Sequence, residues 1–316
     1  MNSKFRKALN RRYFFCVHAA HRTLLLFLFS VLLLQNTKAE DSLSSTQKSN
    51  KRLIILSTSV NVAYIGSMVA LSEIWYKDSP KSNFHFFNDN HEWLQMDKIG
   101  HFTASFHESV FGVKALEWAG LPHKKAVLIG SLAGFVYQTP IEYFDGRSAE
   151  YGASLGDIVA NTTGSALCMG QYLLWDEIRI QPKFSFHRTS LAPQRPAVLG
   201  KGLSEEFLKD YNGQTYWLSA NIYSFLRNKE TTKFPKWLNL ALGYGGHNMF
   251  YASTKNNKAE GIHPYRQYYL SMDIDFSKVQ TKKWVKVLLY PLNFIHIPLP
   301  ALEYSQNKLT FHPVYF

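Results

Sequence analysis

Three long stretches of the chain run without a charged residue over lengths that suit helices. They are residues 53–72, 126–141 and 158–175, with 20, 16 and 18 residues respectively. Extended by the segments that flank them, these runs predict helices at 53–72, 124–144 and 154–175. The segment between the first two runs predicts a further helix at 97–118. We expect a proline at position 140 to loosen the last turn of the third helix.

Small residues recur at helical spacing on the third and fourth predicted helices. Such residues let helix backbones approach closely in membranes and in tight bundles. The residues are Gly130, Ala133, Gly134, Ala160, Gly164, Ala166 and Gly170. The four segments therefore predict one compact helical unit, membrane-embedded or membrane-apposed.

The hydrophobic pattern changes in the C-terminal part of the chain. Apolar and polar residues alternate over residues 268–276, which predicts a strand whose polar face, with Asp273 and Asp275, is solvated. Residues 284–290 predict a short amphipathic helix, and residues 308–316 predict another strand. The chain ends in phenylalanine, as outer-membrane barrels do, but one clearly alternating strand is too few for a closed barrel.

The N-terminus has the pattern of an export signal. Residues 1–39 hold seven basic residues and no acid, and the apolar run 24–34 has the length of a signal-peptide core. The alternative is an uncleaved N-terminal anchor. Residues 40–52 are polar and rich in serine, which predicts a flexible linker.

These segments define the expected fold class and domains. We expect a mainly α protein, a four-helix membrane-associated bundle followed by a smaller mixed α+β C-terminal region. The boundaries are 1–39 for the signal peptide, 40–52 for the linker, 53–180 for the helical domain and 181–316 for the C-terminal region.

The net charge of +12 does not indicate nucleic-acid binding. Once the seven basic residues of 1–39 are removed, 28 basic residues face 23 acidic ones, a net of +5 with no basic stripe. After export, Cys168 would be alone in an apolar helix, where it should act as a small buried hydrophobe. The chain has no P-loop, dinucleotide fingerprint or CxxC sequence.

Polar clusters beside the apolar helices are the candidates for chemistry. Asp97 and His101 are four residues apart and share one helical face. One interpretation makes His101 a metal ligand or proton-transfer group oriented by a carboxylate. The other makes Asp97 the N-cap of its helix and His101 a hydrogen-bonded core residue.

The second cluster is at the start of the fourth helix. Ser154 and Asp157 fit a capping box, in which Ser154 caps the helix and Asp157 reaches back. Capping does not explain Asn161, one turn later. A buried asparagine needs partners, which Asp97, His101 or Arg147 could supply.

The third cluster combines Glu142, Asp145 and Arg147. An ion pair between Arg147 and one acid leaves a surplus carboxylate. With His101 and Asp157, these acids could form an acid–base or hard-metal site. We therefore select His101, Glu142, Asp145 and Asp157 as catalytic candidates, the first three as metal candidates, and Asp97, Lys98, Arg147 and Asn161 as ligand-binding candidates.

In combination these clusters resemble known families. Asp97-Lys98-x-x-His101, Glu142 at a helix end, Gly146-Arg147 and Asp157-x-x-x-Asn161 resemble the pattern of VanZ-like membrane proteins. The longer match is similar to the domain-of-unknown-function family of YfiM-like predicted periplasmic or lipoprotein-type proteins. This resemblance implies an envelope location and a helical core. The chain departs from the lipoprotein pattern because Cys16 follows aromatic residues rather than a lipid-attachment sequence.

We therefore expect an exported, non-enzymatic cell-envelope protein with a buried polar centre. The expected partners are a membrane and an envelope lipid or cell-wall ligand, with no nucleic acid and no cofactor. The alternative is a membrane-associated hydrolase or transferase that acts on an envelope lipid or glycan.

Overall fold

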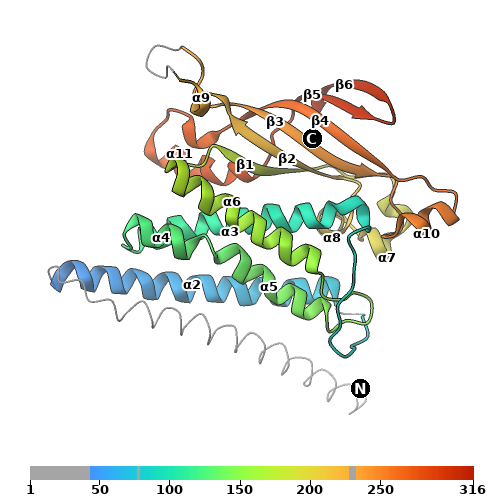
Figure 1. The fold of residues 1–316 in the computed structure, drawn as a ribbon, viewed down its shortest axis with the longest axis horizontal. Coiled ribbons are helices and arrows are strands. Elements are labelled where there is room, and N and C mark those ends of the chain that lie inside the picture. The colour runs from blue at the N-terminus through green and yellow to red at the C-terminus, as the bar shows by residue number, and fades with distance from the viewer. Residues whose placement is uncertain (1–42, 77–78, 228–232) are drawn as a thin grey trace. The chain divides into compact units, whose positions relative to one another are not determined.

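The computed structural model describes residues 43–76, 79–227 and 233–316 (Figure 1). Its described residues divide between two compact units. The first contains α2 (Leu43–Trp75) and residues Ala115–His123, and the second contains Lys81–Lys114 and Lys124–Phe316. The predicted signal peptide, residues 1–39, lies outside the described residues.

In the first unit, α2 is attached to the end of the following helix. Ser49 Oγ donates a hydrogen bond of 2.8 Å to the Ala119 carbonyl. From Ser49 to Trp75, α2 is long and apolar enough to cross a membrane, and only 6% of its most apolar window is buried. Because α2 begins at Leu43, the linker predicted at 40–52 is wrong over 43–52, where Gln, Lys and Arg suit a helix.

The second unit begins with helices that agree well with the hydrophobic pattern. They are α3 (Met96–Trp118) up to Lys114, α4 (His123–Gly130) from Lys124, α5 (Ala133–Asp145) and α6 (Leu155–Trp175). The single helix predicted at 124–144 is interrupted because serine hydroxyls replace its internal hydrogen bonds. Ser109 Oγ donates to the Ser131 carbonyl, while Ser165 Oγ accepts the Phe135 N–H.

Glycine brings these helices into backbone contact, as predicted. A Cβ on Gly134 would lie 1.9 Å from the Ser105 carbonyl oxygen, and one on Gly164 would lie 2.3 Å from that of Phe102. Helix α3 therefore packs directly against α5 and α6. A buried core of Phe106, Val113 and Cys168 fills the remaining space.

The C-terminal half corrects the predicted fold class. It forms one six-stranded antiparallel sheet with strands in chain order, rather than a smaller mixed region after a four-helix bundle. The strands are β1 (Ile180–Phe186), β2 (Gln214–Asn221), β3 (Leu238–His247), β4 (Tyr265–Ile274), β5 (Leu299–Ser305) and β6 (Lys308–Tyr315). Figure 1 shows them as one curved sheet.

Short helices occupy the connections between strands. They are α7 (Pro196–Leu199), α8 (Leu203–Lys209), α9 (Ile222–Phe225), α10 (Thr254–Ala259) and α11 (Lys283–Leu289), with 3-10 turns at Trp93–Gln95, Ala192–Gln194, Phe276–Lys278 and Tyr290–Phe294. The strands β4 and β6 and the helix α11 confirm the periodicities read from the sequence.

The sheet is curled tightly enough for β2 to touch β6. The hydroxyls of Thr215 and Tyr315 lie 2.9 Å apart, although four strand spacings, about 19 Å in a flat sheet, separate their strands. We call the side that carries these residues the inner face. Its core contains Trp217, Ala241 and Tyr269, and His296 stacks on Trp217 with 3.8 Å between ring centroids.

The polarity of the sheet is the reverse of the prediction for β4. Its polar residues Gln267, Ser271 and Asp273 point to the inner face, where Asp273 has no exposed surface and pairs with Lys183 at 2.7 Å. Its apolar residues, Leu270 and Met272, are 43% and 41% exposed on the opposite side, which we call the outer face. The expected solvated face with Asp273 and Asp275 is therefore wrong, because the curl encloses that face.

Candidate functional site

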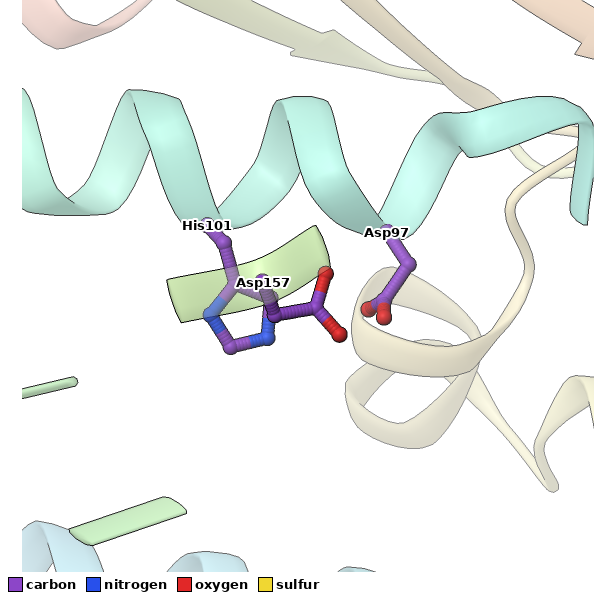
Figure 2. Close-up of side chains that lie close together, drawn as sticks. All are labelled: Asp97, His101 and Asp157. Atoms are coloured by element: carbon purple, nitrogen blue, oxygen red, sulfur yellow. The ribbon is translucent and has the colours of Figure 1, made fainter. Parts of the chain in front are cut away.

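Helices α3 and α6 bring two carboxylates and an imidazole together. Asp97 and His101 lie one turn apart near the start of α3, and Asp157 lies in the first turn of α6. One potential ligand atom from each residue lies within 4.8 Å of the other two. Figure 2 shows the Asp157 carboxylate beside the His101 ring and the Asp97 carboxylate. We call these residues the three-residue cluster.

Local sequence explains why the two helices begin where they do. Ser154 is the N-cap of α6, and its Oγ accepts the Asp157 N–H at 3.1 Å, which confirms the predicted cap. The carboxylate of Asp157, however, bonds Lys98 across the helix interface. Asp97 is not an N-cap, since α3 already begins at Met96 after a turn of left-handed residues.

Neighbouring donors hold one oxygen of each carboxylate in the cluster. Lys98 Nζ lies 3.2 Å from Oδ1 of Asp157 and 2.7 Å from Oδ1 of Asp89. The Tyr211 hydroxyl donates to Oδ1 of Asp97 at 2.5 Å. Each carboxylate is therefore oriented by a neighbouring donor, an arrangement common around metal ligands.

The imidazole of His101 is oriented in the same manner. Its Nδ1 lies 3.2 Å from Oδ1 of Asn161, so that the ring donates through Nδ1 and leaves the lone pair on Nε2. Its Nε2 lies 3.8 Å from Oε1 of Glu142. Asn161 has no exposed surface, and of the three partners suggested by the sequence its side chain bonds His101.

Two buried polar atoms next to His101 are unsatisfied. Within the described part of the chain, Oε1 of Glu142 and Nδ2 of Asn161 have no hydrogen-bond partner. Glu142 is only 3% exposed, and its other oxygen accepts the Ser154 N–H at 2.8 Å. Unpaired buried polar groups are costly, so these atoms mark a place where a bound species would be stabilised.

The electrostatics of the centre reflect a surplus of acid. Burial raises the pKa of Glu142 to about 8 and, with repulsion from Asp97, raises that of Asp157 to about 6. Burial alone would lower the pKa of His101, but attraction to the carboxylates outweighs it and raises that pKa. For Lys98 as well, Asp89 and Asp157 overcome burial and raise the pKa.

The remaining predicted residues lie at the end of α5. Asp145 is the last residue of that helix. Arg147 lies in the following turn, and its carbonyl accepts the Ser82 N–H. Neither belongs to the three-residue cluster. Asp145 contributes to the raised pKa of His101 through its charge. The ion pair predicted for Arg147 stays a prediction.

Sequence reasoning missed Asp89 and Tyr211. Asp89 belongs to the loop before α3, where it also accepts a hydrogen bond from Ser154 Oγ at 2.6 Å. Tyr211 is 114 residues from Asp97 in the chain. The turn sequence around Tyr211 is visible in the sequence, but no local pattern connects it with α3.

The cluster can hold a proton or a cation with one nitrogen and two oxygen donors. Such a mixed donor set suits first-row divalent ions better than calcium, which takes six to eight oxygens.

Comparison with known proteins places this site within a described family region. No curated protein and no solved structure matches the chain. Residues 83–173 match the family described as predicted periplasmic lipoprotein (DUF2279), and this range includes α3, α5 and the whole three-residue cluster. The protein is therefore an exported protein of the cell envelope, similar over residues 83–173 to the predicted periplasmic lipoprotein family.

Proposed function

We propose that this envelope protein is non-enzymatic and that its polar centre binds one divalent metal ion between α3 and α6. The observation that carries the proposal is the convergence of Asp97, His101 and Asp157 within 4.8 Å. The ligands would be Nε2 of His101 and the second oxygen of each aspartate. The neighbours that hold the other atoms supply the orientation that such ligands need.

Charge balance supports a cation. Asp89, Asp97 and Asp157 provide three negative charges, and Lys98 is the cation that bonds two of them. A divalent ion would offset the remaining charge and attract Oε1 of Glu142, which has no hydrogen-bond partner. Buried charges are stable only when they are paired or coordinate a metal.

The donor chemistry narrows the choice of ion. One imidazole and two carboxylates match zinc or manganese, whereas magnesium and calcium favour sites built from oxygen. The buried Oε1 of Glu142 would serve as a fourth ligand and close the site, which supports a structural role for such an ion, because closed sites leave no coordination position for a substrate.

A second candidate function rests on Glu142. A carboxyl group with a pKa of about 8 is protonated at neutral pH and can act as a general acid. This observation favours a hydrolase or transferase that acts on an envelope lipid or glycan. A relationship of this chain to VanZ-like and YfiM-like proteins is likewise a proposal.

Metal content measured on the purified full chain tests the proposal. We expect about one equivalent of zinc or manganese, lost in Asp97→Asn and in His101→Gln. His123→Gln is the matched control, since His123 also lies beside a carboxylate, at 2.5 Å from Glu117, but is exposed and outside the site. Titration of the metal-free protein with each ion should raise its melting temperature.

Retention of the metal in both variants would contradict the proposal, as would a parent protein that binds neither ion. Turnover of a lipid or glycan that depends on Glu142 would favour the second candidate function instead.

A further inference from the structure

The outer face of the sheet carries continuous apolar rows across neighbouring strands. The strand register places one residue of each strand directly opposite the next. One row consists of Pro182, Leu218, Leu242, Leu270, Leu302 and Phe311, and the adjacent row of Phe184, Tyr216, Tyr244, Tyr268, Tyr304 and Leu309. Leu240 and Met272 begin a third row. None of these positions carries a charge.

Most of this face is open to its surroundings. Helix α3 and the turn before it cover its β1–β2 side and Tyr244 of β3: a Cβ on Gly100 would lie 2.8 Å from the Tyr216 hydroxyl, and the Tyr244 hydroxyl donates to the Leu94 carbonyl. Farther along, large side chains are exposed by 41–66%: Leu218, Leu240, Leu242, Tyr268, Leu270, Met272, Tyr304, Leu309 and Phe311. Together they expose on the order of 800 Å², more than the few hundred Å² usual for an apolar patch on a soluble monomer.

We propose that the outer face of β3–β6 rests in one leaflet of an anionic lipid bilayer. In water an antiparallel sheet turns its apolar side chains to the core and its polar ones to solvent. Here the inner face holds the ion pair of Lys183 with Asp273, and the outer face holds the aliphatic residues. An apolar outer side beside tyrosines is the pattern of lipid-facing strands.

The extent of the apolar surface along the strands fits one leaflet of a bilayer. Residues on the same face of a strand are about 6.8 Å apart, so three rows with their side chains cover about 15–20 Å. This value is close to half of a hydrocarbon core of about 30 Å. The face therefore suits insertion into one side of a membrane.

Charge complementarity supports anionic lipid. The connection from β4 to β5, residues 275–298, contains four lysines and one acid, Asp275. Lys278 is bonded to Glu177, and the other three lysines belong to the region of α11. In this region Trp284 and Leu288 are 63% and 66% exposed. Lysines next to exposed tryptophan and leucine are typical of segments that lie at the membrane interface.

A second protein fits this face less well. Protein interfaces carry about one hydrogen bond per 100–200 Å² and a polar rim around an apolar centre. The outer rows offer no polar side-chain groups except tyrosine hydroxyls at one end, where Arg266 lies beside them. Lipid tails require no hydrogen bonds from this surface.

Quenching of an attached fluorophore by spin-labelled lipid tests the proposal. The full chain, with Cys16→Ser and Cys168→Ala, would carry the fluorophore at Leu270→Cys or Phe311→Cys. Asn256→Cys on α10 is the matched control, because it is exposed in the same unit but away from the outer face. This site-specific signal separates contact by the sheet from insertion of α2.

With phosphatidylethanolamine–phosphatidylglycerol vesicles, we expect severalfold stronger quenching at both outer-face positions than at Asn256→Cys, and weaker quenching with phosphatidylcholine alone. Equal quenching at the three positions overturns the proposal, and so does its absence at Leu270→Cys and Phe311→Cys. Disulfide-linked dimers of Leu270→Cys in high yield, without quenching, would assign the face to a second copy. Unchanged melting temperatures show that the variants are folded.

Discussion

The buried ion pair on the inner face provides the sharpest test of how the sheet is stabilised. Lys183 and Asp273 have no exposed side-chain surface, and Nζ lies 2.7 Å from Oδ2. Nζ also donates to the Ile274 carbonyl at 2.7 Å, and Ser219 Oγ donates to Oδ2 of Asp273 at 2.5 Å. Burial lowers the pKa of Lys183 despite the attraction of Asp273.

We expect Asp273→Asn to destabilise the fold by about 3–5 kcal/mol, because it leaves the Lys183 cation buried without a counter-charge. The lysine can avoid this state only by losing its proton. From an unperturbed pKa of about 10.4, deprotonation at pH 7 costs about 4.6 kcal/mol, at 1.36 kcal/mol per pH unit. This cost is the upper limit of the destabilisation expected for Asp273→Asn. Lys183→Met should cost a similar amount.

The double variant should recover much of this loss. With Lys183→Met and Asp273→Asn together, neither charge is stranded, and we expect a coupling energy of about 2 kcal/mol or more. Lys278→Met is the matched control, since its pair with Glu177 is 28% and 29% exposed and should contribute less than about 1 kcal/mol.

Urea unfolding followed by circular dichroism measures the free energy of unfolding of each variant. The dependence of that free energy on urea concentration should be the same in all variants. A cost for Asp273→Asn no larger than that for Lys278→Met would refute the reasoning.

Two further predictions concern the helices. Gly164→Ala should lower the melting temperature, since its Cβ would lie 2.3 Å from the Phe102 carbonyl oxygen. A Cβ on Gly170 would meet nothing within 4 Å, so Gly170→Ala should raise the free energy of unfolding by about 0.5–1 kcal/mol. Equal effects would contradict this. Glu108 has a pKa raised by burial from 4.5 to about 8, so its contribution to stability is full below pH 4.5 and is lost as the pH rises through 8. Glu108→Gln keeps the bond with Gln138 and should remove that decline, measured as urea stability against pH; an unchanged pH dependence would exclude Glu108 as its source.

The helical half was largely predictable because its signals are local. Uncharged runs and the Ser154 cap located α6 within one residue of its observed start, and Asp97 likewise marked the beginning of α3. The break between α4 and α5 was not predictable, since the hydroxyls of Ser109 and Ser165 that stabilise it come from other helices.

The extent of the sheet could not be read from the chain. Pro182 weakens the strand signal of β1, which the fold tolerates because β1 is an edge strand. Glycines weaken the signal of β3, although Gly243 is needed there because a Cβ would lie 2.7 Å from the Trp217 ring.

The sequence by itself determined the helices near the site, the strand periodicity of β4 and the residue types of the polar centre. Tertiary structure alone decided which side of β4 is enclosed, because a period of two assigns residues to two faces without saying which is buried. It also selected Asp97, His101 and Asp157 from the polar candidates and brought Tyr211 to them across 114 residues. Such contacts depend on how distant segments pack, and no local pattern encodes that packing.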